Sequence, residues 1–344
     1  MTEDHVINFS FLAAALVAAH PGHEEKLATR DLLSYKAHLR RGLDRCARSF
    51  EESGLTARAI ARRAEVAKKY RARHVLRTRD TDDVLNTDHE SSENYTLSTS
   101  ESEIFASAST CVLNPEGEIG PPWVDGELVR TDIIEDQAGI PVVLDLQFVD
   151  VSTCQPIEGI YAETWNCNAT AVYSGETFLR GVSETDEDGV VTFKTLFPGH
   201  YAGRATHYHV LAHLDATLLE NNTLTGGSVP HIGQLFFDQD LITAVEATSP
   251  YSFNTIEITT NAEDRMFSTE TSGTTSDPVL NYVYLGDSLE DGLLAWTTIA
   301  IDLTAEYTPT YSFVWTENGS EAVSGSSSGA GGTGDSGTGG ASGP

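Results

Sequence analysis

Short segments rich in β-branched and aromatic residues recur along the chain from residue 142 onward, with turn residues between them. Several short strands at such intervals are typical of an antiparallel β-sandwich or barrel. The acidic stretch 185–189 ends in Asp188-Gly189, which predicts a hairpin turn because glycine supplies the positive φ that such turns need. A calcium-binding loop is the alternative interpretation of that stretch. The expected strands are Val142 to Val149, Ile160 to Trp165, Val190 to Phe193, His207 to His213, Leu235 to Phe237, Ile256 to Thr260, Val279 to Tyr284 and Trp296 to Asp302.

Charge is distributed unevenly along the chain. Residues 1–80 hold sixteen Lys and Arg against ten Asp and Glu, whereas residues 81–344 hold five against forty-one. A body this acidic repels nucleic acid and anionic membranes, so neither is an expected partner. The five basic residues of the body stand out electrostatically, and they are Arg130, Arg180, Lys194, Arg204 and Arg265.

The N-terminal part of the chain differs from its centre in composition and in the spacing of its apolar residues. An apolar run at residues 9–19 predicts a secretory signal peptide cleaved after Ala19. Copper binding by a new terminal His20 is an alternative that lacks a convincing second ligand. Apolar residues at helical spacing, interrupted at residues 52–55, then predict two amphipathic helices. Their basic face either meets solvent or docks on the acidic body or a second subunit, which would give a homodimer.

The chain length and the strand-rich pattern predict one principal domain with accessory segments. Gly, Ser, Ala and Thr dominate the end of the chain, which therefore cannot bury enough surface to fold. The expected parts are a signal peptide at 1–19, a helical N-terminal region at 20–79, a linker at 80–105, a catalytic β-sandwich at 106–317 and a disordered tail at 318–344.

The cysteines and glycosylation sequons fit a secreted, extracellular protein. The chain has four cysteines, an even number, so two disulfides are expected, and the sequence leaves all three pairings open. The cysteines are Cys46, Cys111, Cys154 and Cys167. Acceptor asparagines for N-glycosylation are Asn94, Asn168, Asn221 and Asn318.

Four side chains form a candidate metal site. His207 and His209 are two apart on an expected strand, so they project from the same face. Tyr201 lies six residues earlier, and Tyr173 follows a turn further upstream. Two phenolate oxygens and two imidazoles are a hard, mixed donor set that suits ferric iron.

The motifs around these residues resemble those of intradiol ring-cleavage dioxygenases, particularly their secreted fungal branch. The resemblance runs from about Cys111 to Asp302. Its motifs are Gly120-Pro121-Pro122-Trp123, Tyr173-Ser174-Gly175, Phe178-Leu179-Arg180-Gly181, Phe197-Pro198-Gly199-His200-Tyr201, Gly203-Arg204-Ala205-Thr206-His207-Tyr208-His209 and Gly233-Gln234-Leu235-Phe236-Phe237.

The resemblance implies roles for particular residues. Tyr173, Tyr201, His207 and His209 would be ligands of a non-haem Fe(III), with Tyr201 the ligand displaced by substrate. Arg204 would stabilise negative charge on the substrate ring, and its alternative is an ordinary salt bridge. Gln234 would bond to a ligand or the substrate. Trp123 either lines the pocket or packs in the core, and Arg130 and Arg180 are interpreted as structural.

The implied reaction is cleavage of a catechol-type ring between its two hydroxyl-bearing carbons, with both atoms of O2 inserted and a cis,cis-muconate-type product. The alternative is a secreted β-sandwich binding module without catalysis, of carboxypeptidase-regulatory or transthyretin type, or an iron-binding protein without turnover. Such modules share the entry at Cys154 to Gly159 and the Asp-Gly turn, but do not require the two tyrosines and two histidines.

Overall fold

A computed structural model describes ten stretches of the chain, three of them for their backbone alone. The fully described stretches are 38–39, 41–42, 45–46, 48–71, 123–172, 177–271 and 277–307, and the backbone stretches are 110–111, 313–316 and 319–322. The expected signal peptide, the linker at 80–105 and most of the tail lie outside these residues.

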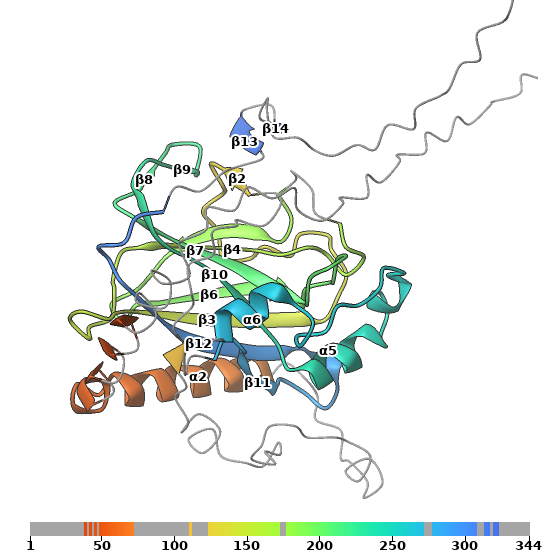
Figure 1. The fold of residues 1–344 in the computed structure, drawn as a ribbon, viewed down its shortest axis with the longest axis horizontal. Helices are drawn as coiled ribbons and strands as arrows, with labels where there is room; N and C mark the ends of the chain where they lie inside the picture. Colours follow the sequence, from red (N-terminus) through yellow and green to blue (C-terminus); the bar gives the residue numbers. More distant parts are fainter. Residues whose placement is uncertain are drawn as a thin grey trace, which may run out of the picture.

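Two β-sheets form the body of the protein (Figure 1). The first has the order β1-β12-β3-β6, with β11 also paired to β12, and the second has the order β10-β7-β4-β5. Their strands are β1 (Thr110–Cys111), β3 (Pro141–Asp150), β4 (Tyr161–Trp165), β5 (Arg180–Glu184), β6 (Val190–Leu196), β7 (His207–Leu214), β10 (Ser228–Phe236), β11 (Asn281–Tyr284) and β12 (Leu293–Ile301).

Smaller elements surround the two sheets. Two short sheets pair β8 with β9 and β13 with both β14 and β2. The elements are α2 (Leu55–Arg71), β2 (Val124–Asp125), β8 (Thr217–Leu218), β9 (Leu224–Thr225), α5 (Gln239–Glu246), the 3-10 helices Tyr251–Phe253 and Leu289–Asp291, α6 (Arg265–Thr271), β13 (Phe313–Thr316) and β14 (Gly319–Ala322). No helix in the described part of the chain is long and apolar enough to cross a membrane.

The expected sandwich is strand-rich as predicted, but it is not wholly antiparallel. Every pair in the four-stranded sheet is antiparallel. In the other sheet, β12 runs parallel to both β3 and β1. Parallel neighbours need a long crossover, and here the chain builds the whole four-stranded sheet between β3 and β12.

Two local predictions were wrong. Residues 256–260 form no strand, because the Ile256 carbonyl accepts from His200 Nε2 and the Thr260 N–H bonds to Glu263. The stretch 185–189 is a tight turn, but β5 and β6 on either side of it pair in different sheets, so it is no hairpin. The Asp186 carboxylate accepts hydrogen bonds from the backbone N–H groups of Asp188 and Val190. This favours a structural turn over a calcium-binding loop.

The first residues of the expected tail also differ from the prediction. Gly319–Ala322 pairs antiparallel with Phe313–Thr316, as strands β14 and β13. The tail residues are small and polar, but the neighbouring strand supplies backbone partners that do not depend on side-chain burial. The rest of the expected tail lies outside the described residues.

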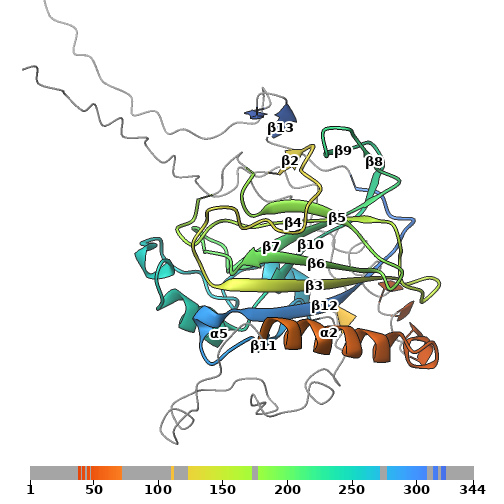
Figure 2. The same ribbon diagram turned by 180° about the vertical axis from the view of Figure 1, so that it is seen from behind.

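Helix α2 packs along the outer face of the five-stranded sheet, beneath β12 (Figures 1 and 2). It begins just after the predicted break, and Ala67 packs on Val283 and Trp296. Arg62 and Arg63 donate to Asp145 at 3.0 and 3.1 Å. Of the two interpretations of the basic helix, the structure supports docking on the acidic body. A dimer contact through the N-terminal region stays a prediction.

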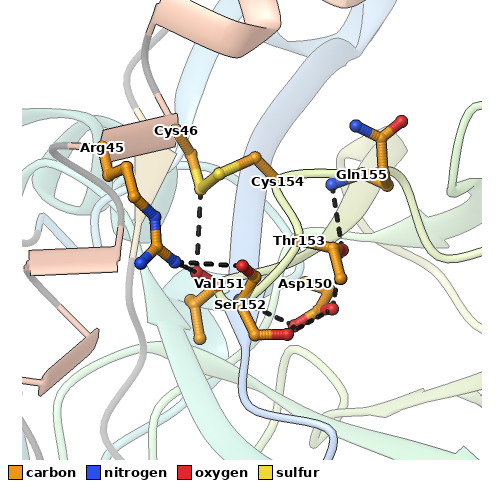
Figure 3. Close-up of a disulfide and its surroundings, with 8 residues drawn as sticks. All are labelled: Arg45, Cys46, Asp150, Val151, Ser152, Thr153, Cys154 and Gln155. Carbon is orange, nitrogen blue, oxygen red and sulfur yellow. Dashed lines mark hydrogen bonds between the residues drawn. A yellow bond between two sulfur atoms is a disulfide. The ribbon is translucent and has the colours of Figure 1, made fainter.

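A disulfide joins the N-terminal region to the sandwich. Cys46 and Cys154 are bonded to each other, and Arg45 donates to the Val151 carbonyl oxygen at 2.8 Å beside them (Figure 3). This pairing rules out two of the three arrangements that the sequence leaves open. Cys167 is buried, with its Sγ 3.1 Å from the Gly199 carbonyl oxygen. The side chain of Cys111 lies outside the described residues.

Candidate metal centre

Strand β7 carries the two histidines on the face of the four-stranded sheet that points away from the sandwich core. Alternation along the strand sends Tyr208 and Val210 into the core between the sheets. His207 and His209 therefore share the opposite face, as predicted, and both are buried. Burial on this face comes from loops that cover it, so the imidazoles are shielded from water.

Three donor atoms converge at this place. The Tyr201 Oη lies 3.2 Å from His207 Nε2, and the two Nε2 atoms of His207 and His209 lie 3.1 Å apart. The Nδ1 of His207 is 2.6 Å from the Ala205 carbonyl oxygen, which can only accept. Nδ1 therefore carries the proton and, in the neutral ring, Nε2 presents its lone pair to the shared point.

The loop at 197–206 places Tyr201 beside the histidines. Gly199 passes so close to the Asn168 carbonyl oxygen that a Cβ would collide with it. Next to it, His200 is held between Glu246, at 2.7 Å from Nδ1, and the Ile256 carbonyl oxygen, at 2.9 Å from Nε2. Burial alone would lower the pKa of His200, but these two acceptors outweigh it and raise the pKa. The loop is thus fixed on both sides of its turn.

Tyr173, the fourth expected ligand, lies outside the described residues, which stop at Val172 and resume at Thr177. Its place in the site stays a prediction.

A row of side chains crosses the whole four-stranded sheet at the level of His209. Gln234 on β10 and Trp165 on β4 are the direct partners of His209, and Arg180 on β5 is opposite Trp165. The Trp165 ring stacks on the His209 imidazole, with 4.6 Å between centroids and an angle of 6°. Stacking at this angle fixes the plane of the imidazole. The sequence prediction missed Trp165, whose only signal was its position at the end of an expected strand.

Arg204 lies beside this row. One of its Nη atoms donates to Gln234 Oε1, and its Nε donates to Asp264 Oδ2 at 2.9 Å. The structure therefore brings Arg204 and Gln234 into contact, and it also gives Arg204 the salt bridge that was the alternative. Asp264 was not predicted. A carboxylate just before α6 is a recognisable helix cap, but nothing in the sequence links it to Arg204.

Trp123 forms part of the wall around Tyr201. It is buried in a cluster with Tyr201 and Trp165, and its Nε1 donates to Glu163 Oε1 at 2.7 Å. Trp123 therefore packs in a buried cluster, and that cluster includes the donor Tyr201. Behind the wall, burial raises the pKa of Glu127 to about 8 although Arg180 lies 3.3 Å away.

Arg130 and Arg180 serve structural roles, as interpreted. Arg130 forms an ion pair with Glu135 at 2.7 Å and donates to the Arg180 carbonyl oxygen. Both arginines hold loops against the edge of β5.

The donor chemistry of this site fits a ferric ion. Among the described side chains, no group of three His, Cys, Asp or Glu is arranged to hold a metal. The convergence of one phenol with two imidazoles is a different set, since it adds a hard oxygen donor that favours Fe(III). The tautomer of His207 leaves the Nε2 lone pair available to the ion.

The fold and the site together define a β-sandwich protein with buried tyrosine and histidine donors on one sheet face. No protein-family model matches the chain, and curated proteins give no match. Among solved structures, an intradiol ring-cleavage dioxygenase from Tetranychus urticae is 32% identical, with 59% of this chain and 98% of that one covered and a TM-score of 0.48.

A second dioxygenase structure is 31% identical, with the same coverage of 59% and 98% and a TM-score of 0.49. A hydroxyquinol 1,2-dioxygenase from Pseudomonas putida DLL-E4 is 16% identical, with 58% of this chain and 69% of that one covered and a TM-score of 0.38. At 32% identity across nearly all of the Tetranychus urticae protein, the present chain is similar to an intradiol ring-cleavage dioxygenase.

Proposed function

We propose that this protein is a secreted, non-haem Fe(III)-dependent intradiol dioxygenase that cleaves a catechol-type ring between its two hydroxyl-bearing carbons. O2 is the second substrate, both of its atoms enter the product, and the product is a cis,cis-muconate-type diacid. The observation that carries the proposal is the convergence of Tyr201 Oη with the Nε2 atoms of His207 and His209. The likeness of the chain's motifs to those of intradiol ring-cleavage dioxygenases supports the same activity.

The proposed ligands are Tyr201, His207, His209 and Tyr173. Fe(III), when bound, supplies a positive charge that favours the deprotonated forms of phenols and catechols. As a phenolate, Tyr201 would have a basic oxygen that can receive a substrate proton at Oη. The burial of all three described donors excludes water and strengthens each charge interaction in the site.

Arg204 is a buried cation beside the row of side chains that contains His209. Its guanidinium lies against Gln234, which is the direct strand partner of His209. We assign it the stabilisation of negative charge that develops on the substrate ring. Gln234 accepts from Arg204 and so orients the guanidinium toward the donors.

The test combines metal content, colour and turnover of the purified full chain. We expect stoichiometric iron, a burgundy colour from Fe(III)-bound phenolate, and consumption of one O2 per catechol with formation of a muconate. His207→Ala and His209→Ala should lose iron and colour together. His213→Gln is the matched control, because His213 lies on the same strand and face but is paired with Glu163 at 2.7 Å.

The outcomes separate the alternatives. A protein that stays colourless and free of iron after reconstitution would overturn the ferric site. A coloured protein that consumes no O2 with catechols, hydroxyquinol or larger diols would instead be a binding or iron-holding module. Equal iron loss in His213→Gln would show that the effect is structural.

Secretion is part of the proposal and has separate support. The Cys46–Cys154 disulfide is typical of a protein that folds in an oxidising compartment. The apolar run at residues 9–19 supports export through a cleaved signal peptide. N-terminal sequencing of the protein recovered from culture medium should begin at His20, and protein retained in the cell with residues 1–19 attached would contradict secretion.

A further inference from the structure

Asp264 lies next to the site, and the proposed reaction gives it no role. Its side chain is buried, with 1% exposed. One carboxylate oxygen, Oδ2, accepts from Arg204 Nε at 2.9 Å and from the Ala205 backbone N–H at 2.6 Å. The other, Oδ1, accepts from the backbone N–H groups of Met266 and Phe267 at 2.6 and 2.9 Å. Four donors thus fix one carboxylate.

The ionised form of Asp264 is the one that this environment selects. Burial alone would raise the pKa of the carboxyl, but Arg204 and the backbone N–H donors outweigh burial and hold the pKa below its ordinary value. All four partners are donors, so the site requires an acceptor on both oxygens. An amide in the same place would present an NH2 group to two of these donors.

Two paths lead from Asp264 to the donor atoms. Through Arg204 it fixes the guanidinium that bonds to Gln234. Through the backbone N–H of Ala205 it holds the residue whose carbonyl oxygen accepts from His207 Nδ1. The first path sets the direction of a positive charge, and the second sets which nitrogen of His207 carries the proton.

Helix α6 adds an aromatic contact along the same side. Phe267, whose N–H bonds to Asp264, packs edge-on against Phe236 with 5.1 Å between ring centroids. Phe236 lies 5.7 Å from the His207 ring and is its partner across the strands. Asp264 therefore joins α6, the loop carrying Arg204 and strand β7 into one unit.

We propose that Asp264 is a positioning residue that orients Arg204 toward the substrate and holds His207 in the tautomer with its proton on Nδ1. This inference rests on the proposed function, because it assigns to Asp264 the geometry of two groups that the proposed reaction uses. Asp264 itself touches neither substrate nor the reacting atoms.

The test is a double-mutant cycle between Asp264→Asn and Arg204→Gln, measured on the full-length, iron-loaded protein. Misplacement of a charged group in a site costs up to about 10²-fold in rate. We expect Asp264→Asn to lower kcat by about 10-fold to 10²-fold in the wild-type background, with a smaller change in KM. In the Arg204→Gln background the same change should cost less than about threefold, because Arg204 is already gone and only the path through Ala205 remains.

A second readout does not depend on turnover. Nitrogen-15 NMR of the iron-free protein reports the His207 tautomer, which we expect to be the Nδ1–H form in the wild type and mixed in Asp264→Asn. Glu263→Gln is the matched control, since Glu263 is the adjacent carboxylate, is exposed and, among the described residues, bonds within its own turn to Thr260.

Four results would overturn the inference. The first is a kcat for Asp264→Asn within twofold of Glu263→Gln, and the second is an equal loss in both Arg204 backgrounds. The third applies if Asp264→Asn does not fold, in which case Asp264→Glu replaces it. This variant keeps the charge but displaces it by one methylene, and it should still lower kcat about tenfold. A wild-type kcat in Asp264→Glu would exclude a positioning role. The fourth is an unchanged His207 tautomer in Asp264→Asn, which refutes the Asp264 role alone. A wild-type protein that consumes no O2 refutes the proposed function instead.

Discussion

His231 is a buried histidine in the core of the sandwich, and its titration should make stability depend on pH. It lies on β10 opposite Ala212, a member of the main core cluster, and its side chain is 1% exposed. Its Nε2 has no hydrogen-bond partner in the described part of the protein. Burial is the cause that lowers the pKa of His231 to about 3.

The size of the effect follows from proton linkage. In the unfolded chain a histidine has a pKa of about 6.5. Below about pH 6.5 the unfolded state therefore binds a proton that the folded state does not bind. A depressed folded pKa therefore gives stability that is complete above pH 6.5 and is lost progressively as the pH falls toward 3. At pH 5 the loss is about 2 kcal/mol, whereas at pH 7.5 it is about 0.1 kcal/mol or less.

The assay is urea unfolding of the wild type and of His231→Leu at pH 7.5 and at pH 5, followed by tryptophan fluorescence. Leucine has a similar volume and does not titrate, so every other group contributes equally to both proteins. We expect the wild type to lose about 2 kcal/mol more than the variant between the two pH values. Equal losses in the two proteins would refute the assignment of a neutral, unpartnered His231 in the core.

Three further perturbations test the structure. Asp145→Asn leaves the buried Arg63 without its counter-charge and should lower the free energy of unfolding by about 3–5 kcal/mol, seen in the urea midpoint; a loss below 1 kcal/mol would contradict the burial of this pair. Replacing both Cys46 and Cys154 by Ser opens a link across 108 residues, with an expected cost of about 4–5 kcal/mol read from the Tm, and an unchanged Tm would oppose a stabilising role. Trp165→Leu removes the ring stacked on His209 and should weaken iron retention about 10- to 100-fold in chelator competition, while wild-type retention would show that the stack does not orient the ligand.

Strands whose side chains meet a core were predictable, and those defined by their neighbours were not. Val142 to Val149 is apolar almost throughout because β3 is buried along nearly its whole length, and the structure places the strand there. The segment 256–260 is also rich in β-branched residues, but Ile258 is 40% exposed and the segment pairs with none of the described strands. Composition reports burial and propensity, whereas strand pairing depends on distant segments that a local pattern does not contain.

Some residues of the donor site were likewise predictable from the sequence, and others were not. His207 and His209 follow from period-two geometry, and the family resemblance supplied Tyr201, Arg204 and Gln234. Asp264 is sixty residues from Arg204 along the chain, and their contact exists only because α6 returns to the loop before β7. Contacts of that kind carry no local sequence signal.

The site on β7 is a consequence of how the strand is packed on its other face. Tyr208 is fully buried and its hydroxyl donates to the Leu196 carbonyl oxygen at 2.9 Å, which locks that side chain into the space between the sheets. A slip of one residue would turn Tyr208 outward and both histidines into the apolar core, so core packing strongly disfavours it. The same register sets Gln234 and Trp165 on either side of His209. Core packing thus fixes the strand alignment that brings the polar row together, and the loop at 197–206 then adds Tyr201 and Arg204 to a row that the sheet has already aligned.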